Sequence, residues 1–268
     1  MATHLHLDPF SGIAGDMFLG ALVDLGVEVG ALRAALAPLP VERSYDIVTR
    51  RVSRHGIGAV DLKVRVEPAE HGDGHHHTHY PQLMEMAAAL DTTPRGRERA
   101  GAVVTALADA EARVHGTPRE KVHFHEVGAV DSIVDLLGAA VALELLDIDT
   151  LSCGALPISR GFVRCDHGLM PVPAPATAYL MEGLPTVGVD RRGELVTPTG
   201  AAIVRAWCGS FGPPPAMTLR GVGYGAGDRE DPDVPNLLRV MLGETTPAGK
   251  HGPMTPDEAR AVALPPVA

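Results

Sequence analysis

The sequence predicts an α/β protein with a mixed sheet, flanking helices and a long flexible histidine-rich loop. Short segments with alternating apolar residues are interleaved with longer segments of helical periodicity. Glycine and proline number 30 and 23 and are spread along the chain, which indicates many tight turns. Aromatic residues make up only 4% of the chain, so the core must be built mainly from Leu, Val, Ile and Ala.

The first elements can be predicted from capping and alternation. A strand at residues 3–7 places His4 and His6 on one face. A turn-rich loop leads from it to a helix that begins at Asp16, a good N-cap, and ends at Gly26. A hairpin then follows, because two alternating segments flank a Gly-containing turn. Its strands are expected at residues 46–53 and 62–66.

The remainder of the chain is predicted to be mainly helical, with short strands between the helices. We expect helices at 81–90, 94–114, 130–146, 174–182 and 198–208. The last helix lies behind Thr197, a plausible cap with proline in the first turn. Short strands and loops cover 151–173, and a final strand covers 236–242. We expect one α/β domain over 1–243, with its histidine-rich loop at 68–80, and a flexible tail over 244–268.

Charge and composition exclude several classes of partner. The net charge is −10 and no stripe of Lys or Arg is present, which argues against nucleic acid and anionic membranes as partners. The N-terminus lacks the features of a signal peptide, and no apolar run approaches the roughly 18 residues of a membrane span. The three cysteines are widely spaced and form no disulfide framework. A cytoplasmic location is therefore expected.

A polar segment contains a dense histidine tract. Neutral imidazole suits Ni, Zn, Cu and Fe, so such a tract is typical of metal binding. An expression tag would be terminal and unbroken, whereas this tract is internal and interrupted by glycine. We predict a flexible arm that captures a metal ion, whose identity the spacing leaves open. Its candidate metal ligands are His71, His75, His76, His77 and His79.

A second cluster precedes the long apolar helix. If the segment before that helix is extended, His123 and His125 project to the same side, and Glu126 follows directly. Asp131 and Asp135 lie four residues apart and share one helix face. A purely structural role is the alternative, because an acidic residue in the first helical turn complements the helix dipole. Two imidazoles beside carboxylates nevertheless indicate a metal or catalytic site, which would also suit Fe or Mn.

Two further loops precede helices and offer backbone N–H groups to an anion. The first cannot be a P-loop, because Asp16 occupies the place where lysine would be required. Carboxylates in this loop would repel a bare phosphate, so a cation or a cationic ligand is needed nearby; a plain tight turn is the alternative. The candidate ligand-binding residues of the two loops are Asp8, Ser11, Gly12, Gly15, Asp16, Thr197, Thr199 and Gly200.

A glycine-rich run at 221–227 does not bind a dinucleotide in our interpretation. An acidic, proline-containing loop follows it, where the dinucleotide-binding motif requires a helix.

Five ordered blocks of sequence resemble the LarC family of nickel insertion proteins. The resemblance runs from about residue 4 to residue 243, and a histidine-rich loop between a hairpin and the next helix is typical of the family. The blocks are LDPFSGIAGDMFLGAL at 7–22, HFHEVGAVDSIVD at 123–135, PVPAPAT at 171–177, LVTPTGAA at 195–202 and GYGAG at 223–227.

The resemblance implies a reaction of the chelatase or cyclometallase type, classed as a lyase. Ni²⁺ is inserted into pyridinium-3,5-bisthiocarboxylic acid mononucleotide, with formation of Ni–S and Ni–C bonds, to give the nickel-pincer cofactor of lactate racemase-type enzymes. Imidazoles would release nickel to a soft sulfur–carbon–sulfur pincer that holds it more tightly. We hypothesise that the first glycine loop holds this substrate, whose cationic ring tolerates Asp8 or Asp16 nearby. The reacting site is expected at His123, His125, Glu126 and Asp131, of which the first three would also bind nickel.

The chain departs from the family pattern at its C-terminal end. Full-length members carry a C-terminal domain that binds CTP with Mn²⁺ or Mg²⁺, and residues 244–268 resemble no such domain. A separately encoded C-terminal partner would then supply it, and a homo-oligomer is compatible with the sequence. Two alternatives to the insertion reaction stay open: a non-catalytic nickel store or metallochaperone, and a metal-dependent phosphoester hydrolase.

Overall fold

A computed structural model describes residues 2–41, 43–67, 78–124, 128–165 and 167–245. Three predictions fall outside these residues. They concern the histidine tract up to His77, the pair His125 and Glu126, and all but the first two residues of the predicted tail.

The fold is organised by a seven-stranded mixed sheet. β1 lies in the interior of the sheet, parallel to β6 on one side and antiparallel to β13 on the other. β12 pairs antiparallel with β13 and touches β3 in parallel, while β2 and β3 form the predicted hairpin. The strands in sheet order are β11 (Cys208–Phe211), β6 (Thr150–Cys153), β1 (Ala2–Asp8), β13 (Leu237–Thr245), β12 (Met217–Ala226), β3 (Ile57–Val66) and β2 (Tyr45–Arg54).

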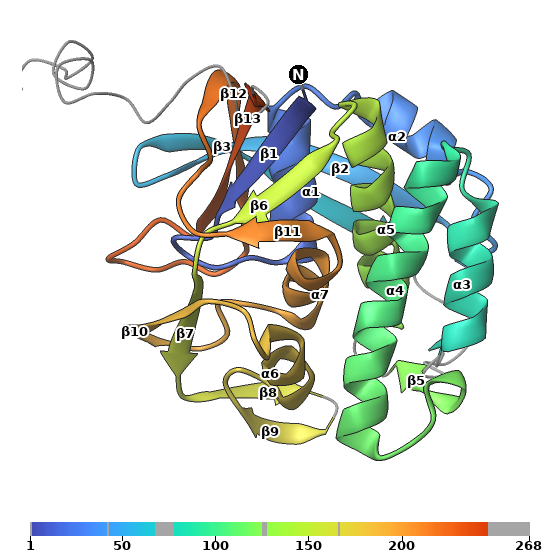
Figure 1. The fold of residues 1–268 in the computed structure, drawn as a ribbon. Coiled ribbons are helices and arrows are strands. Elements are labelled where there is room, and N and C mark those ends of the chain that lie inside the picture. The colour runs from blue at the N-terminus through green and yellow to red at the C-terminus, as the bar shows by residue number, and fades with distance from the viewer. Residues whose placement is uncertain (1, 42, 68–77, 125–127, 166, 246–268) are drawn as a thin grey trace, which may run out of the picture.

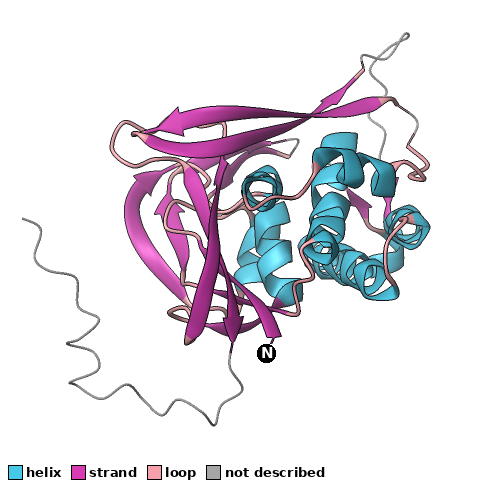
Figure 2. Cartoon of the chain, turned by 90° about the horizontal axis from the view of Figure 1, so that it is seen from above, coloured by secondary structure: helices cyan, strands magenta, loops and turns pink. Residues whose placement is uncertain are grey.

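The helices gather on one side of this curved sheet (Figure 2). α1 lies directly against β12 and β3 and also contacts α5, while α4 packs against α5, α6 and α7 (Figure 1). The sheet side and the helix side are thus joined through α1 and α5. In the described part of the chain the helices are α1 (Gly15–Asp24), α2 (Val29–Leu36), α3 (Tyr80–Ala89), α4 (Pro94–His115), η1 (Arg119–Lys121, a 3-10 turn), α5 (Val130–Leu145), α6 (Pro175–Met181) and α7 (Pro198–Trp207).

Three short strand pairs complete the fold. Two of them lie at the end of the molecule farthest from the N-terminus (Figure 1): the parallel pair β7 and β10, and the antiparallel hairpin of β8 and β9. The third joins β4 and β5, which flank α3 and α4 in sequence. Their bounds are β4 (Thr78–His79), β5 (His123–Phe124), β7 (Leu156–Arg160), β8 (Phe162–Cys165), β9 (Gly168–Pro171) and β10 (Thr186–Arg192).

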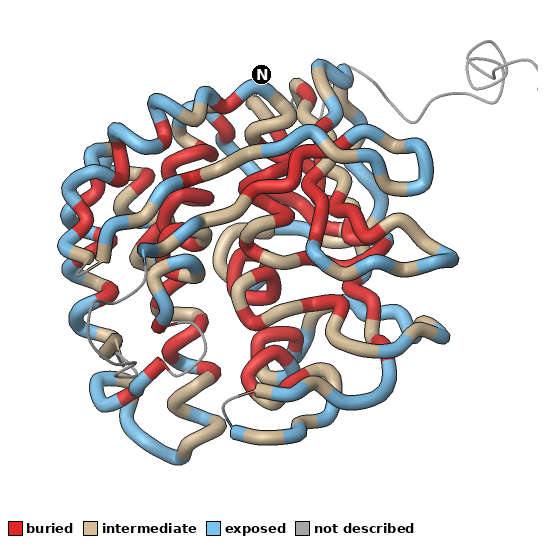
Figure 3. Tube along the Cα trace, turned by 180° about the vertical axis from the view of Figure 1, so that it is seen from behind, coloured by how far each residue is buried: buried red, intermediate tan, exposed pale blue. Residues whose placement is uncertain are grey.

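The hydrophobic core lies between the sheet and the helices (Figure 3) and is mainly aliphatic, as predicted. Phe18 on α1 and Phe124 on β5 are the largest of its fully buried side chains. The predicted shared face of His4 and His6 is confirmed, since both rings are buried and lie 2.8 Å from the Ser152 hydroxyl. Burial lowers the pKa of both imidazoles, so the core holds them in the neutral form. Among the described helices, none is long and apolar enough to span a membrane.

Most predicted elements are confirmed to within two or three residues, and one predicted helix cap is corrected. Asp16 is not an N-cap: the cap position is Ala14, and Asp16 lies in the first turn of α1. The helix at 29–36 was missed, because it is only 8 residues long with a short apolar stripe. The glycine-rich run belongs to a long strand, β12, whose glycines allow α1 to approach closely.

Candidate functional site

A lysine that the sequence did not single out holds together several carboxylates. Lys63 on β3 donates to Asp16 at 2.7 Å and lies 2.7 Å from Asp228. Its ammonium nitrogen is also 3.6 Å from the buried carboxylate of Asp61. Burial alone would lower the pKa of Lys63, but Asp16 and Asp228 raise it above its ordinary value. Lys63 is therefore a permanent positive charge beside the start of α1.

Asp135 on α5 faces this cluster. Its Oδ1 atom is buried and has no hydrogen-bond partner among the described residues. Burial raises the pKa of Asp135 well above its ordinary value, and the charges of Asp16 and Asp131 raise it further. The pKa of Asp16 is also raised by burial, although Lys63 opposes that shift. The site thus combines a carboxyl group whose protonated form is favoured by burial with an ion-paired carboxylate, a pairing typical of acid–base sites.

We expect Asp135→Asn to raise the free energy of unfolding near neutral pH. A carboxyl group with a raised pKa in the folded state stabilises the fold fully only below its unfolded pKa, and loses that contribution as pH rises. Asparagine does not titrate, so at pH 7 the variant should gain more than the roughly 0.5 kcal/mol within which neutral surface substitutions fall. Urea unfolding from pH 4 to 8 measures this gain, which should shrink toward pH 4. A constant difference across that range would contradict the assignment.

The two predicted loops meet each other. Ile13 donates its N–H to the Leu195 carbonyl at 2.9 Å, and Gly15 donates to the Thr199 hydroxyl at 3.1 Å. Gly12 adopts φ +116°, and a Cβ there would lie 2.0 Å from the Leu195 oxygen. Several N–H groups of the first loop therefore already have partners within the chain. The contact clamps the starts of α1 and α7 together.

The second loop is capped as predicted, since the Thr197 hydroxyl accepts from the Gly200 N–H at 3.2 Å. Glycine is required at this position, because a Cβ on Gly200 would lie 2.2 Å from the Ile13 carbonyl oxygen.

Cations accompany the acidic residues of the first loop. Arg239 donates from Nε to Asp8 at 2.9 Å, and Arg191 donates to the Ser11 hydroxyl at 2.9 Å. Arg191 is in turn paired with Asp231, and this pairing lowers the pKa of Asp231 to about 2. The repulsion expected between an anionic ligand and the loop carboxylates is thus reduced by arginines that the sequence reasoning had not placed there.

Two histidines from separate predicted clusters lie side by side. His79 on β4 is paired in register with His123 on β5, and their ring centroids are 4.2 Å apart. The strand pair brings the end of the histidine-rich segment to the start of the second cluster. Phe124, whose side chain is buried, anchors β5 in the core and directs the exposed His123 outward.

Within the residues that the structure describes, no three His, Cys, Asp or Glu side chains gather closely enough to hold a metal ion. Asp131 is exposed and accepts a hydrogen bond from the Ser132 N–H at 2.7 Å. It shares the helix face of Asp135, as predicted, and contributes charge to the carboxylate cluster.

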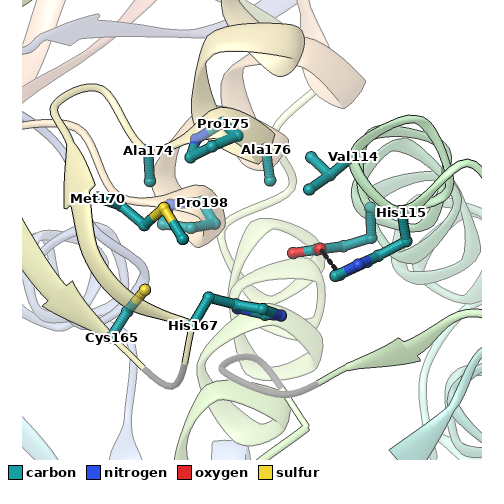
Figure 4. A pocket seen from close by; sticks show the side chains of 10 residues that line it. Val114, His115, Cys165, His167, Met170, Ala174, Pro175, Ala176 and Pro198 are labelled. Carbon is teal, nitrogen blue, oxygen red and sulfur yellow. Dashed lines mark ion pairs between the residues drawn. The ribbon is translucent and has the colours of Figure 1, made fainter.

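A cavity of about 190 Å³ lies where α4, the β8–β9 hairpin and the starts of α6 and α7 meet. His115 approaches it from α4, and Cys165 and Met170 approach from the hairpin (Figure 4). The rings of His115 and His167 are 5.1 Å apart. Pro198, next to Thr199, forms part of the wall, so the cavity adjoins the clamped loops. The residues that line this cavity were not predicted from the sequence. The spacing of a glutamate four residues before His115 on one helix nevertheless indicates an ion pair there.

The fold and these clusters define an α/β protein with paired imidazoles and a buried acid–base group. The sequence pattern of the nickel insertion protein family matches residues 5–261. The chain belongs to this nickel insertion protein family, which confirms the family resemblance inferred from the sequence.

Individual relatives agree with this assignment. A protein of Citrifermentans bemidjiense named for nickel insertion is 50% identical over 246 residues, which cover 92% of this chain and 63% of the relative. The pyridinium-3,5-bisthiocarboxylic acid mononucleotide nickel insertion protein of Geobacillus kaustophilus is 44% identical over 254 residues, 93% of this chain and 62% of the relative. The chain thus spans somewhat less than two thirds of the length of these relatives. No solved structure matches the chain.

Proposed function

We propose that this chain inserts Ni²⁺ into pyridinium-3,5-bisthiocarboxylic acid mononucleotide to form the nickel-pincer cofactor. The family membership and the name of the Geobacillus kaustophilus relative support this reaction. The pair of His79 and His123 is the observation that supports this proposal from the residues of the chain itself. Both come from histidine clusters predicted to bind metal, and the strand pair places their rings 4.2 Å apart.

Nickel moves, in this proposal, from imidazole to sulfur. Neutral imidazole is a borderline ligand that binds Ni²⁺ and can release it to softer donors. The histidine tract captures the ion, and His79 and His123 pass it to the thioacid groups of the substrate. The sequence-based prediction adds His125, Glu126 and Asp131 to the reacting site, and the first two lie outside the described residues.

The clamped loops are the proposed place of the substrate. Asp8, Ser11, Gly12, Gly15 and Asp16 contribute the first loop, and Thr197, Thr199 and Gly200 contribute the second. Several N–H groups of the first loop already form hydrogen bonds within the chain. The phosphate of the substrate would therefore be bound by the neighbouring arginines and by the N–H groups that form no such bond. CTP with Mn²⁺ or Mg²⁺ would act through a part of the protein beyond this chain, consistent with the greater length of the relatives.

The proposal is tested by nickel binding to variants of the pair. We expect His79→Ala/His123→Ala to raise the Kd for Ni²⁺ in equilibrium dialysis at least roughly tenfold, because lost metal-site interactions commonly weaken binding by that factor. His55→Asn is the matched control: His55 is exposed, and asparagine tolerates its positive φ of 50°. Unchanged nickel affinity in the double variant would overturn the role of the pair.

Formation of product is the second measurement. Mass spectrometry after mixing the chain with Ni²⁺, the unmetallated mononucleotide and a C-terminal partner should detect the metallated nucleotide. A protein that binds nickel yet never yields this product would be a nickel store, and the insertion reaction would be refuted.

A further inference from the structure

Asp135 lies where three helices converge. It is on the first half of α5, and a Cβ placed on Gly15, the first residue of α1, would lie 3.0 Å from the Asp135 Cβ. The same Cβ would lie 3.3 Å from the hydroxyl of Thr199 in the first turn of α7. Glycine at position 15 therefore keeps the space beside the carboxyl group clear of a side chain.

One oxygen of this carboxyl group has no hydrogen-bond partner among the described residues. Buried carboxyl oxygens are normally hydrogen-bonded, and Asp135 Oδ1 has no such bond to any described residue. Lys63, whose positive charge acts on Asp135, is already committed to Asp16 at 2.7 Å. A buried polar atom that is left unsatisfied at a convergence of helix starts indicates a functional role more than a structural one.

The proposed reaction requires a proton acceptor. A Ni–C bond forms at the ring carbon between the two thioacid groups only if that carbon loses its hydrogen. The electron pair of the C–H bond then forms the Ni–C bond, and a base takes the proton. No oxidation or reduction is involved, because Ni²⁺ replaces H⁺ on the carbon.

We infer that Asp135 is the catalytic base that removes this ring proton during nickel insertion. The inference rests on the proposed function and assigns one step of it to one side chain. Burial raises the pKa of Asp135 and so favours its protonated form at rest. The positive charge of arriving nickel and of the pyridinium ring favours its ionisation, and the resulting carboxylate accepts the ring proton and later releases it to water.

The neighbouring carboxylates fit this role less well. Asp16 is occupied by Lys63 and by the Met17 N–H at 2.7 Å. Asp131 is exposed, so water competes for its oxygens. Asp61 also has a buried oxygen without a hydrogen bond, but it is ion-paired with Arg50 and lies near Lys63. Among the described carboxylates of this cluster, Asp135 combines such an oxygen with a position beside the clamped loops.

Hydrogen exchange at the ring carbon tests the inference. The chain is incubated with Ni²⁺, the mononucleotide, CTP with Mg²⁺ and the C-terminal partner in D₂O, and mass spectrometry follows both deuterium uptake into the mononucleotide and the metallated product. We expect Asp135→Asn to slow product formation and exchange by roughly 10²-fold or more, as for loss of a general base. Its Kd for Ni²⁺ should match that of the wild type. Asp190→Asn, a substitution at an exposed ion pair with Arg160, is the matched control and should leave both rates unchanged.

The outcomes separate the inference from the function on which it rests. If wild type metallates the substrate and Asp135→Asn does so within threefold of its rate, Asp135 is not the base, and the function stands. If wild type binds nickel but neither metallates nor exchanges, the proposed function fails and the inference with it. Loss of folding is monitored by circular dichroism, and Asp135→Asn is expected to be at least as stable as wild type near pH 7.

Discussion

Gly225→Ala is expected to destabilise the protein by at least about 3 kcal/mol, or to prevent its folding, although it adds a single methyl group. Gly225 lies on β12 under α1, and a Cβ there would lie 1.7 Å from the Met17 carbonyl oxygen and 2.7 Å from the Ala21 amide nitrogen. Both atoms belong to the helix backbone, so no side-chain rotation relieves the collision. Either α1 must move away from the sheet or β12 must bend.

The effect is large because α1 joins the two sides of the fold. It contacts β12 and β3 on the sheet and α5 among the helices, and its first turn carries Gly15 and Asp16 of the candidate site. Total stabilities of domains are only about 5–15 kcal/mol, so this loss is a substantial fraction. In thermal unfolding a deficit of that size corresponds to roughly 6–12 °C for a chain of this length.

Gly58→Ala is the matched control. Gly58 also lies on a strand, but a Cβ added to it meets no atom within 4 Å. We expect a change within about 0.5 kcal/mol, as for surface substitutions. A melting temperature of Gly225→Ala within roughly 2 °C of wild type, measured by circular dichroism, corresponds to an effect below about 1 kcal/mol. Such a result would refute the close approach of α1 to β12.

Local sequence signals predicted much of this fold because they act over a few residues. The cap of Thr197 with Pro198 located α7, and the turn at Gly56 located the β2–β3 hairpin. The same signals did not predict a strand at Gly225, since a glycine-rich segment has the composition of a loop. Only the tertiary contact with α1 explains why a strand there needs glycine.

The candidate site was predicted only in part, for a similar reason. The spacing of Asp131 and Asp135 indicated a shared helix face, and the two histidine clusters were visible as composition. Register between distant strands decides that His79 meets His123, and no local pattern encodes that register. Lys63 was overlooked because the alternation of apolar and polar residues shows only on which side of the strand its side chain lies. Its carboxylate partner on α1 lies 47 residues away.

Lys63→Met should lower the free energy of unfolding by about 2–3 kcal/mol at pH 7, somewhat less than the loss of one partner from a fully buried ion pair. Methionine keeps most of the aliphatic stem but removes the ammonium that faces Asp16, Asp61 and Asp228. Asp61 retains Arg50 at 2.6 Å, so most of the penalty should fall on Asp16. Urea unfolding measures the loss, and Lys121→Met, at an exposed position, should change stability by less than about 0.5 kcal/mol.

The pH dependence separates lost charge from lost packing. Without Lys63 the pKa of Asp16 in the folded state rises further, so the variant's deficit should be greatest near pH 7 and should shrink as pH falls toward 4, where Asp16 takes up a proton. Asp16→Asn in the Lys63→Met background should restore most of the stability at pH 7, since it removes the charge left unpaired. A deficit independent of pH and unaffected by Asp16→Asn would mean that Lys63 stabilises the fold through its methylene groups, because packing contacts do not titrate.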